Sequence, residues 1–320
     1  MADDSAGGHP VTVGLVGAGR WARLTHGPMH TTPGPTRLVG VWARRRAAAD
    51  ELAAELGVPA FRQVEDLLAA CEAVAFAVPP AVQGELAPLA ARAGKALLLE
   101  KPLAETLPQA REVADAVAGA EVASVVALTR RYHAGTREFL RTAADLRAQG
   151  GPAGAQALYL HGGYLPGGFL QGIAATTWRG GPAGMLLDIG PHLLDLVQEA
   201  LGRVREVRAV GDPATHLAIT SRHEGGAVGQ SFLSGLVAVD PARTRVEVYA
   251  GAGQARWDTA GLDREEPWTR MRAELAAAVR DGAPVTADAA HGLRLQAVLE
   301  AVRRAADGGG WVSVPTVGDG

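Results

Sequence analysis

Short apolar runs and helical patterns alternate along the first 128 residues. The apolar runs occupy residues 11–16, 38–42, 73–78, 96–99 and 122–128. Helical patterns lie between them, one beginning near residue 20 and others at residues 47–56, 83–93 and 105–117. Short buried strands separated by helices are typical of βαβ units, whose strands run parallel. This part of the chain therefore predicts a doubly wound parallel sheet.

The pattern changes after a helical stretch at residues 136–147. Apolar runs follow at residues 155–160, 207–210, 227–233 and 244–249, joined by glycine-rich connections. One helix is predicted at residues 193–201, and two more, at 268–280 and 288–306, finish the chain. We expect an α/β protein of two domains, in which residues 1–128 hold the parallel sheet. Residues 129–320 are expected to form an α/β domain with a large open, mostly antiparallel sheet.

Composition narrows the classes of function. The chain is 48% hydrophobic and 20% charged with a net charge of −3, which is ordinary for a globular protein and unlike a nucleic-acid-binding surface. Its single cysteine, Cys71, cannot form an internal disulfide, which favours a reducing compartment, and its apolar neighbours favour a core position. No leader-like or membrane-spanning apolar segment is visible. We expect a cytoplasmic protein that acts on a small molecule, with no nucleic acid and no membrane as partner.

A glycine turn follows the first predicted strand. Residues 17–22 read Gly-x-Gly-x-x-Ala and open a helix. In this fingerprint the first glycine permits a tight turn, the second lets a pyrophosphate approach the backbone, and the small Ala22 lets the helix pack on the strand. Free N–H groups at the helix N-terminus then meet the phosphates. The pattern predicts a dinucleotide site in a Rossmann domain, with contacts from Gly17, Ala18, Gly19, Arg20 and Trp21.

The end of the second strand bears on which dinucleotide binds. An NAD-binding domain usually carries Asp or Glu there, to hold the ribose 2′-hydroxyl. This chain has Ala43, Arg44 and Arg45 instead, with no carboxylate before Asp50. Guanidinium groups can pair with a 2′-phosphate. Because arginine outnumbers lysine by 29 to two in this chain, an arginine at any given position is weak evidence for such a contact. The missing carboxylate is therefore the stronger argument. We predict NADP(H) as the preferred cofactor and NAD(H) as the alternative.

One of the two lysines lies at a position suited to catalysis. Lys101 follows Glu100 and precedes Pro102 at the carboxyl end of a predicted parallel strand, the edge along which ligands bind. Lys95 lies at the opposite end of that strand and is interpreted as a solvated loop residue. A lysine ammonium can polarise a carbonyl oxygen, and burial readily lowers its pKa.

A second motif lies in the second half of the chain. Asp188 and His192 are four residues apart and Asp195 follows three later, which puts all three on one face if the stretch is helical. Pro191 leaves open a helix start or a kink at this point. A histidine suits proton transfer near neutral pH, so His192 is the candidate general acid/base. Asp188 is the candidate to orient His192 or a substrate hydroxyl, and Asp195 is expected to play a supporting structural part.

These motifs together resemble the glucose–fructose oxidoreductase / inositol dehydrogenase / MocA (Gfo/Idh/MocA) family. The resemblance covers nearly the whole chain and rests on the glycine turn, on residues 100–102 and on the Asp/His motif, in that order. Residues 130–132 are similar to the family's crossover segment, and residues 178–179 precede the Asp/His motif as they do in the family. Two positions depart from the family pattern: Gln83 stands where a histidine is common, and residues 183–185 replace a fuller glycine run.

The resemblance implies a Rossmann domain followed by an α/β domain whose open sheet mediates homodimers or homotetramers. It supports Lys101, His192 and Asp188 as the catalytic residues. Beyond the glycine turn, the implied cofactor contacts are Arg44, Arg45, Val78, Pro79, Glu100, Lys101, Trp178 and Arg179. The candidate substrate contacts are Tyr132, His161, Tyr164 and Asp188.

Three functions are compatible with these residues. The leading hypothesis is an NADP(H)-dependent oxidoreductase that moves hydride to or from a sugar- or cyclitol-like alcohol or ketone, including a nucleotide-linked keto-sugar. The alternatives are an imine (C=N) reductase and a non-catalytic NADP-sensing regulator, which would be expected to lose the lysine or Asp/His motif. His26 and His30 are four residues apart, but Gly27 and Pro28 separate them and no third ligand is evident, so no metal is expected.

Overall fold

The computed structural model describes residues 9–150, 154–173, 176–263 and 265–318. Within these residues the chain forms two compact units. The first unit takes in residues up to 105, 109–127 and 268–289, and the second takes in 106–108, 128–267 and those from 290 onward. Residues 268–289, far along the sequence, therefore return to the unit that the first part of the chain builds.

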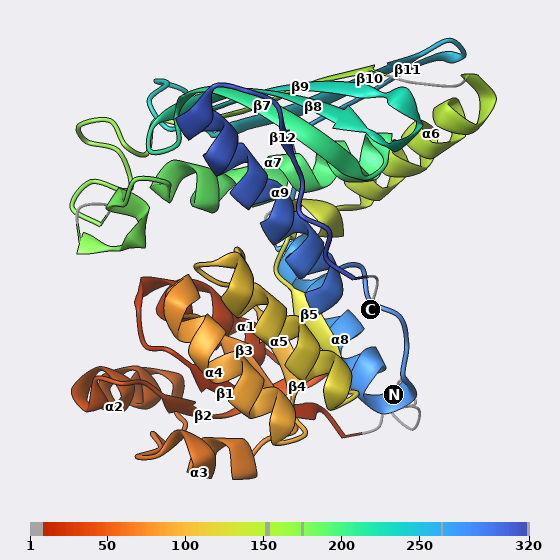
Figure 1. The fold of residues 1–320 in the computed structure, drawn as a ribbon. Helices are drawn as coiled ribbons and strands as arrows, with labels where there is room; N and C mark the ends of the chain where they lie inside the picture. Colours follow the sequence, from red (N-terminus) through yellow and green to blue (C-terminus); the bar gives the residue numbers. More distant parts are fainter. Residues whose placement is uncertain (1–8, 151–153, 174–175, 264, 319–320) are drawn as a thin grey trace. The chain divides into compact units, whose positions relative to one another are not determined.

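A five-stranded parallel sheet, in the order β2-β1-β3-β4-β5, is the centre of the first unit (Figure 1). Its strands are β1 (Val11–Val16), β2 (Thr36–Trp42), β3 (Ala73–Phe76), β4 (Ala96–Leu99) and β5 (Ser124–Val126). The two central strands β3 and β4 are buried along their whole length, as expected for a parallel sheet covered on both faces. The predicted parallel sheet is confirmed, although the last strand is shorter than the apolar run at residues 122–128.

Most helices of the first unit connect these strands, and α8 joins the unit from later in the chain. They are a π-helical turn (Ala22–His26), α1 (Gly27–Thr31), α2 (Arg46–Leu56), α3 (Val64–Ala69), α4 (Pro80–Arg92), α5 (Leu107–Gly119) and α8 (Glu266–Asp281). Helix α8 is tied to the unit by the guanidinium of Arg272, which donates to the hydroxyl and carbonyl oxygens of Thr36 at 2.9 and 3.0 Å. The buried Cys71 thiol lies 3.7 Å from the carbonyl of Leu68, so the expectation of a core position is confirmed.

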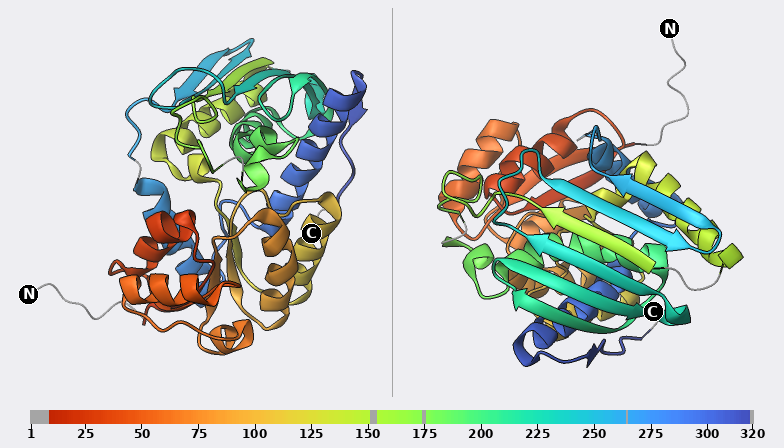
Figure 2. Two further views of the ribbon diagram at one scale, coloured as in Figure 1. Left: turned by 90° about the vertical axis from the view of Figure 1, so that its left-hand side faces the viewer. Right: turned by 90° about the horizontal axis from the view of Figure 1, so that it is seen from above.

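The second unit contains a seven-stranded sheet in the order β11-β10-β6-β9-β8-β7-β12 (Figure 2). Its strands are β6 (Gly154–Leu160), β7 (Val204–Asp212), β8 (His216–His223), β9 (Val228–Ser234), β10 (Arg243–Ala250), β11 (Gly253–Asp258) and β12 (Val312–Ser313). Among the described strands of this sheet, β6 and β9 pair in parallel, and the other neighbours are antiparallel. The predicted mostly antiparallel sheet is confirmed.

Side chains alternate across this sheet. Leu217, Ile219 and Leu233 are buried on the face that α7 covers, whereas Val228 and Phe232 on the other face are exposed. The helices of this unit are α6 (Ala134–Gly150), α7 (Gly184–Leu201) and α9 (Ala289–Gly308), with short 3₁₀ turns at Thr129–Tyr132, Trp178–Gly180 and Glu224–Gly226. No helix of the described residues is long and apolar enough to cross a membrane.

Helix α7 corrects one sequence-based prediction. The helix was predicted at residues 193–201, but it begins at Gly184 and passes through Pro191. A proline inside a helix cannot donate the usual backbone hydrogen bond, which is why the sequence left a break open. Nearly every residue of α7 is buried, so packing on all sides outweighs the loss of that bond. Asp188 and His192 therefore lie one turn apart on a continuous helix.

Candidate active site

The glycine turn has the geometry that the dinucleotide fingerprint requires. Gly17 has φ +122°, and a Cβ added there would lie 2.4 Å from the carbonyl oxygen of Ala77, so only glycine fits. A Cβ added at Gly19 would meet no atom of the described chain within 4 Å. The first glycine is thus needed by the fold itself, whereas the second borders open space in which a phosphate can approach the backbone. Ala22 is completely buried, as helix–strand packing requires.

Trp21 joins the glycine turn to the end of β4. Its indole N–H donates to Oε1 of Glu100 at 2.5 Å, and the ring packs edge-on against Trp268 of α8 with centroids 5.8 Å apart. The indole remains 45% exposed. His26 also bonds to Glu100 Oε1, at 2.8 Å, and it is completely buried. The sequence did not point to Trp268, because it lies in a segment that joins this unit from nearly 250 residues away.

Glu100 is an ionised carboxylate at the centre of these contacts. Burial alone would raise its pKa, but the hydrogen bond and charge of His26, the charge of Lys101 and the Trp21 hydrogen bond outweigh burial and lower it. Its Oε2 also accepts from the backbone N–H of Lys101 at 3.3 Å. Lys101 itself is half-buried. The candidate lysine and the glycine turn are therefore linked through one side chain within the first unit.

The remaining cofactor candidates of the first unit lie at strand ends. Arg44 and Arg45 are exposed after β2, and within the described chain neither is paired with a carboxylate. Asp50 is held by Arg46, with an Nη2–Oδ1 distance of 2.5 Å. Val78 and Pro79 follow β3, and a Cβ at Gly17 would come within 3.0 Å of Val78, which places this segment beside the glycine turn. Among the described residues, the first carboxylate after β2 is therefore already paired with an arginine.

Asp188 and His192 belong to the second unit, on α7. Asp188 pairs with the guanidinium of Arg179 at 3.1 Å, and Arg179 also lies over the ring of Trp178, 4.3 Å from its centroid. The hydroxyl of Tyr164 donates to the carbonyl oxygen of Arg179 at 3.4 Å. Burial, together with the charge of Asp188, raises the pKa of Tyr164 well above its ordinary value, so this hydroxyl stays protonated. The structure brings these predicted residues together around Asp188.

Aromatic rings form a continuous wall beside His192. Its imidazole lies 6.4 Å from the ring of Tyr159, which lies 6.1 Å from His161, and His161 in turn contacts Tyr164 at 5.7 Å and Phe169 at 5.5 Å. Nδ1 of His161 accepts from the backbone N–H of Gly163 at 2.9 Å, so the neutral ring carries its proton on Nε2. Sequence reasoning missed Tyr159 and Phe169, since neither belongs to a recognisable motif.

Two residues of the crossover segment have different surroundings. The guanidinium of Arg130 donates to the hydroxyl of Tyr159 at 3.3 Å and lies over its ring, 5.6 Å from the centroid. Tyr132, a candidate substrate contact, is completely buried. Arg130 therefore contacts the aromatic wall, whereas the Tyr132 side chain lies in the core.

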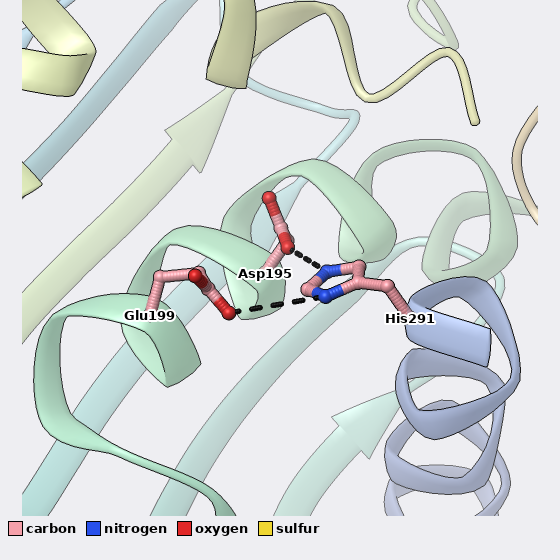
Figure 3. A group of neighbouring side chains, drawn as sticks. All are labelled: Asp195, Glu199 and His291. Carbon is pink, nitrogen blue, oxygen red and sulfur yellow. Dashed lines mark hydrogen bonds and ion pairs between the residues drawn. The ribbon is translucent and has the colours of Figure 1, made fainter. Parts of the chain in front are cut away.

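Asp195 belongs to a buried ion-pair network (Figure 3). Its Oδ1 accepts from Nη1 of Arg131 at 3.0 Å and from Nε2 of His291 at 2.6 Å, while Nη2 of Arg131 pairs with Glu199 at 3.1 Å. Burial alone would raise the pKa of Asp195, but the charges and hydrogen bonds of Arg131 and His291 lower it. Ligand atoms of Asp195, Glu199 and His291 lie close enough to hold a metal ion, but the Arg131 guanidinium already pairs with both carboxylates and opposes a divalent cation. Asp195 thus lies in a buried ion-pair network, and its supporting structural role stays a prediction.

His26 and His30 each contact a different polar side chain. His26 bonds to Glu100, and Nδ1 of His30 lies 2.9 Å from the hydroxyl of Thr36. Burial lowers the pKa of His30 well below its ordinary value, so its ring is neutral. Each histidine thus has one ring nitrogen bonded to a protein group, while Nδ1 of His26 and Nε2 of His30 are buried without a hydrogen-bond partner among the described residues.

Comparisons with known proteins agree with this geometry. The family model described as "Oxidoreductase family, NAD-binding Rossmann fold" matches residues 11–128, and the model "GFO/IDH/MocA C-terminal domain" matches residues 160–256. The chain belongs to the Gfo/Idh/MocA oxidoreductase family. Its first unit thus has the NAD-binding Rossmann fold of that family.

Among curated proteins, YMR315W of Saccharomyces cerevisiae, which is uncharacterized, is 27% identical over 210 residues, covering 63% of this chain. An uncharacterized oxidoreductase of Schizosaccharomyces pombe is 29% identical over 128 residues, covering 38% of this chain. The matched regions span 58% and 35% of the lengths of these two relatives.

Several solved structures have the same fold over nearly the whole chain. GenD2 from gentamicin A biosynthesis, in complex with NAD, has a TM-score of 0.82 at 23% identity, covering 97% of this chain and 99% of its own. Levoglucosan dehydrogenase in complex with NADH and L-sorbose has a TM-score of 0.81 at 19% identity, covering 97% and 100%. A putative myo-inositol dehydrogenase from Sinorhizobium meliloti has a TM-score of 0.79 at 21% identity, covering 95% and 100%. At these identities the likeness is one of fold.

Proposed function

We propose that this protein is an NADP(H)-dependent oxidoreductase that transfers hydride to or from an alcohol or ketone on a sugar- or cyclitol-like molecule. The observation that carries the proposal is the placement of His192 and Asp188 on α7, beside the hydroxyl-bearing rings of Tyr159 and Tyr164. An imidazole suits proton transfer, and neighbouring hydroxyls suit a substrate rich in hydroxyl groups. A nucleotide-linked keto-sugar is included in this class.

The preference for NADP(H) rests on the end of β2. Arg44 and Arg45 are exposed and their guanidinium groups are available to a 2′-phosphate, while Asp50, the first carboxylate after the strand, is paired with Arg46. The glycine turn would receive the pyrophosphate at Gly17–Trp21, with Val78 and Pro79 beside it. When bound, the nicotinamide supplies or accepts the hydride.

The chain's own residues supply the proton chemistry. His192 donates a proton to the carbonyl oxygen as it becomes an alcohol, and it accepts that proton in the reverse direction. For Lys101 we propose that its ammonium stabilises negative charge that develops on a substrate oxygen. Asp188, paired with Arg179, accepts hydrogen bonds and thereby orients His192 or a substrate hydroxyl. We propose Trp178 and Arg179 as further cofactor contacts, and His161 and Tyr164 as substrate contacts.

A screen of NADPH oxidation with keto-sugars and cyclic imines tests this function. We expect turnover with a keto-sugar, and loss of at least about 100-fold in kcat/KM in both Lys101→Ala and His192→Ala. Lys95→Ala is the matched control, because Lys95 lies at the other end of β4 and donates to the carbonyl of Cys71 at 3.0 Å. Turnover that both catalytic variants retain would contradict the assignment, and turnover of imines alone would favour the C=N alternative.

We also propose that the open face of the large sheet joins copies of the chain into a homodimer or homotetramer. Val210, Val228 and Phe232 are exposed on this face, at 62%, 43% and 42%. The strands around Phe232 surround a shallow hollow of about 600 Å³. Phe232→Asp should shift the mass measured by light scattering to that of a monomer, whereas a monomeric unsubstituted protein would contradict the proposal. The single cysteine fits the proposed cytoplasmic location.

A further inference from the structure

The side-chain amide of Gln83 holds the backbone on both sides of Lys101. Gln83 lies in the first turn of α4 and is completely buried. Its Oε1 accepts from the N–H of Glu100 at 2.8 Å, and its Nε2 donates to the carbonyl oxygens of Glu100 at 2.8 Å and Leu103 at 2.9 Å. A third carbonyl, that of Pro102, lies 3.5 Å from the same nitrogen.

These contacts require a carboxamide. The group presents one oxygen to the Glu100 N–H and two N–H groups to the carbonyls of Glu100 and Leu103. If the amide were flipped, its nitrogen would face the Glu100 N–H and its oxygen would face carbonyl oxygens, so no hydrogen bond could form at either place. A glutamate has the same size but lacks the two donors, and a methionine has the same length but lacks every hydrogen bond.

The segment needs such support because it has left the sheet. Strand β4 ends at Leu99, which pairs with Val126 of β5. Beyond that point Gln83 supplies backbone partners to Glu100 and Leu103, and Trp21 and His26 hold the side chain of Glu100. Lys101 thus extends from a backbone that is fixed on either side.

We propose that Gln83 is a positioning residue, which fixes the backbone around Lys101 and thereby the direction of the lysine side chain. This inference rests on the proposed function insofar as Lys101 takes part in the reaction. It also accounts for the departure from the family pattern at residue 83. An imidazole offers only one donor in its neutral form and cannot serve both carbonyls while accepting from the Glu100 N–H.

The scarcity of lysine makes the test selective. Reductive methylation with ¹³C-formaldehyde labels Lys95, Lys101 and the terminal amine, so the spectrum contains few signals and Lys95 is an internal reference in the same molecule. We expect Gln83→Met to move the dimethyl resonance of Lys101 and to leave that of Lys95 in place. Kinetics on unlabelled protein should show kcat lowered by about 10- to 100-fold, the cost of a misplaced catalytic group, with the Kd for NADPH within about twofold.

Two comparisons separate positioning from general stability. Leu52→Met alters a completely buried side chain of α2 in the same unit and should change neither kcat nor the Lys101 resonance. Gln83→Glu keeps the size and one acceptor, and should resemble Gln83→Met in both measurements. A folded Gln83→Met or Gln83→Glu protein with unchanged kcat and an unchanged Lys101 resonance would overturn the proposal.

One measurement needs no variant. In the unsubstituted protein the Glu100 amide hydrogen should exchange with solvent as slowly as those of β4, because Gln83 accepts it in a buried setting. Exchange at the rate of an open loop would overturn the proposal even if neither variant folds. If Lys101→Ala leaves activity intact, the proposed function fails, while the resonance and exchange results still decide the role of Gln83.

Discussion

Replacing Glu72 by glutamine tests how α8 is fastened to the first unit. Glu72 lies just before β3, and Arg280, 208 residues later, pairs with both of its carboxylate oxygens at 2.5 and 3.1 Å. The N–H and hydroxyl of Thr12 donate to the same carboxylate at 2.9 and 3.0 Å. The Arg280 hydrogen bond is the main reason why the pKa of Glu72 is lowered from 4.5 to about 2. The Thr12 hydrogen bonds and the Arg280 charge lower it further, and burial opposes these effects only in part.

The lowered pKa of Glu72 sets the size of the stability loss expected in Glu72→Gln. A pKa that falls from 4.5 to about 2 corresponds to at most about 3 kcal/mol. The side chains of Arg280 and Glu72 are 37% and 40% exposed, so solvent screens the pair, and we expect a loss of about 1 kcal/mol at pH 7. Because the pKa is lower in the folded state, the contribution is complete well above pH 4.5 and disappears as the pH falls toward 2.

Urea denaturation of Glu72→Gln and the unsubstituted protein at pH 7, 4 and 3 measures this difference. The gap in free energy of unfolding should be largest at pH 7, smaller at pH 4 and smallest at pH 3. Asp50→Asn is the control, since its pair with Arg46 is an exposed contact within α2 and should contribute no more than about 0.5 kcal/mol. Equal stability at pH 7, or a gap that does not change with pH, would refute the reasoning.

Three further predictions concern the cofactor turn and the buried network. Replacing Arg44 and Arg45 by serine should raise the Kd for NADPH by about 10- to 100-fold and change that for NADH little, as measured by titration calorimetry. Gly17→Ala should destabilise the protein by about 2 kcal/mol or more because of its positive φ and the close Ala77 carbonyl, whereas Gly19→Ala should fold normally and bind NADPH less tightly. Asp195→Asn should cost about 3 kcal/mol at neutral pH, and the difference should begin to shrink as the pH falls below about 4 and continue to shrink at lower pH, because the folded-state pKa of Asp195 is lowered.

Each of these has a clear contrary outcome. Equal losses of NADPH and NADH affinity in the arginine variant would remove the argument for a 2′-phosphate contact. Equal stability of the two alanine variants would contradict the assignment of separate roles to Gly17 and Gly19. An Asp195→Asn protein as stable as the unsubstituted one would show that Glu199 alone satisfies Arg131.

The sequence predicted the parallel unit more closely than the other unit, for a physical reason. Strands covered on both faces are continuous apolar runs, so β3 and β4 were visible as such. Strand β8 was missed because its buried residues alternate with exposed polar ones such as His216 and Arg222, a weaker signal in a short stretch. The start of α7 was missed because Pro191 and the neighbouring glycines disfavour a helix locally, while tertiary packing favours one.

The candidate site was predictable where it rests on local motifs. The glycine turn, Lys101 and the Asp188–His192 spacing are short patterns, and the structure gives them the expected turn and helix. Gln83, Trp268 and Tyr159 were not recognised in these roles, because their contacts join segments that are distant in sequence. Such contacts leave no periodic signal in a single chain.

Deuterium transfer from NADPH that carries deuterium at both C4 positions tests the central claim most directly. With a keto-sugar found in the substrate screen, mass spectrometry after a single turnover should detect one deuterium on the carbon that becomes the alcohol carbon. The yield should fall by at least about 100-fold in His192→Ala and remain unchanged in Lys95→Ala. Absence of deuterium from every reduced product, or undiminished transfer by His192→Ala, would contradict the account.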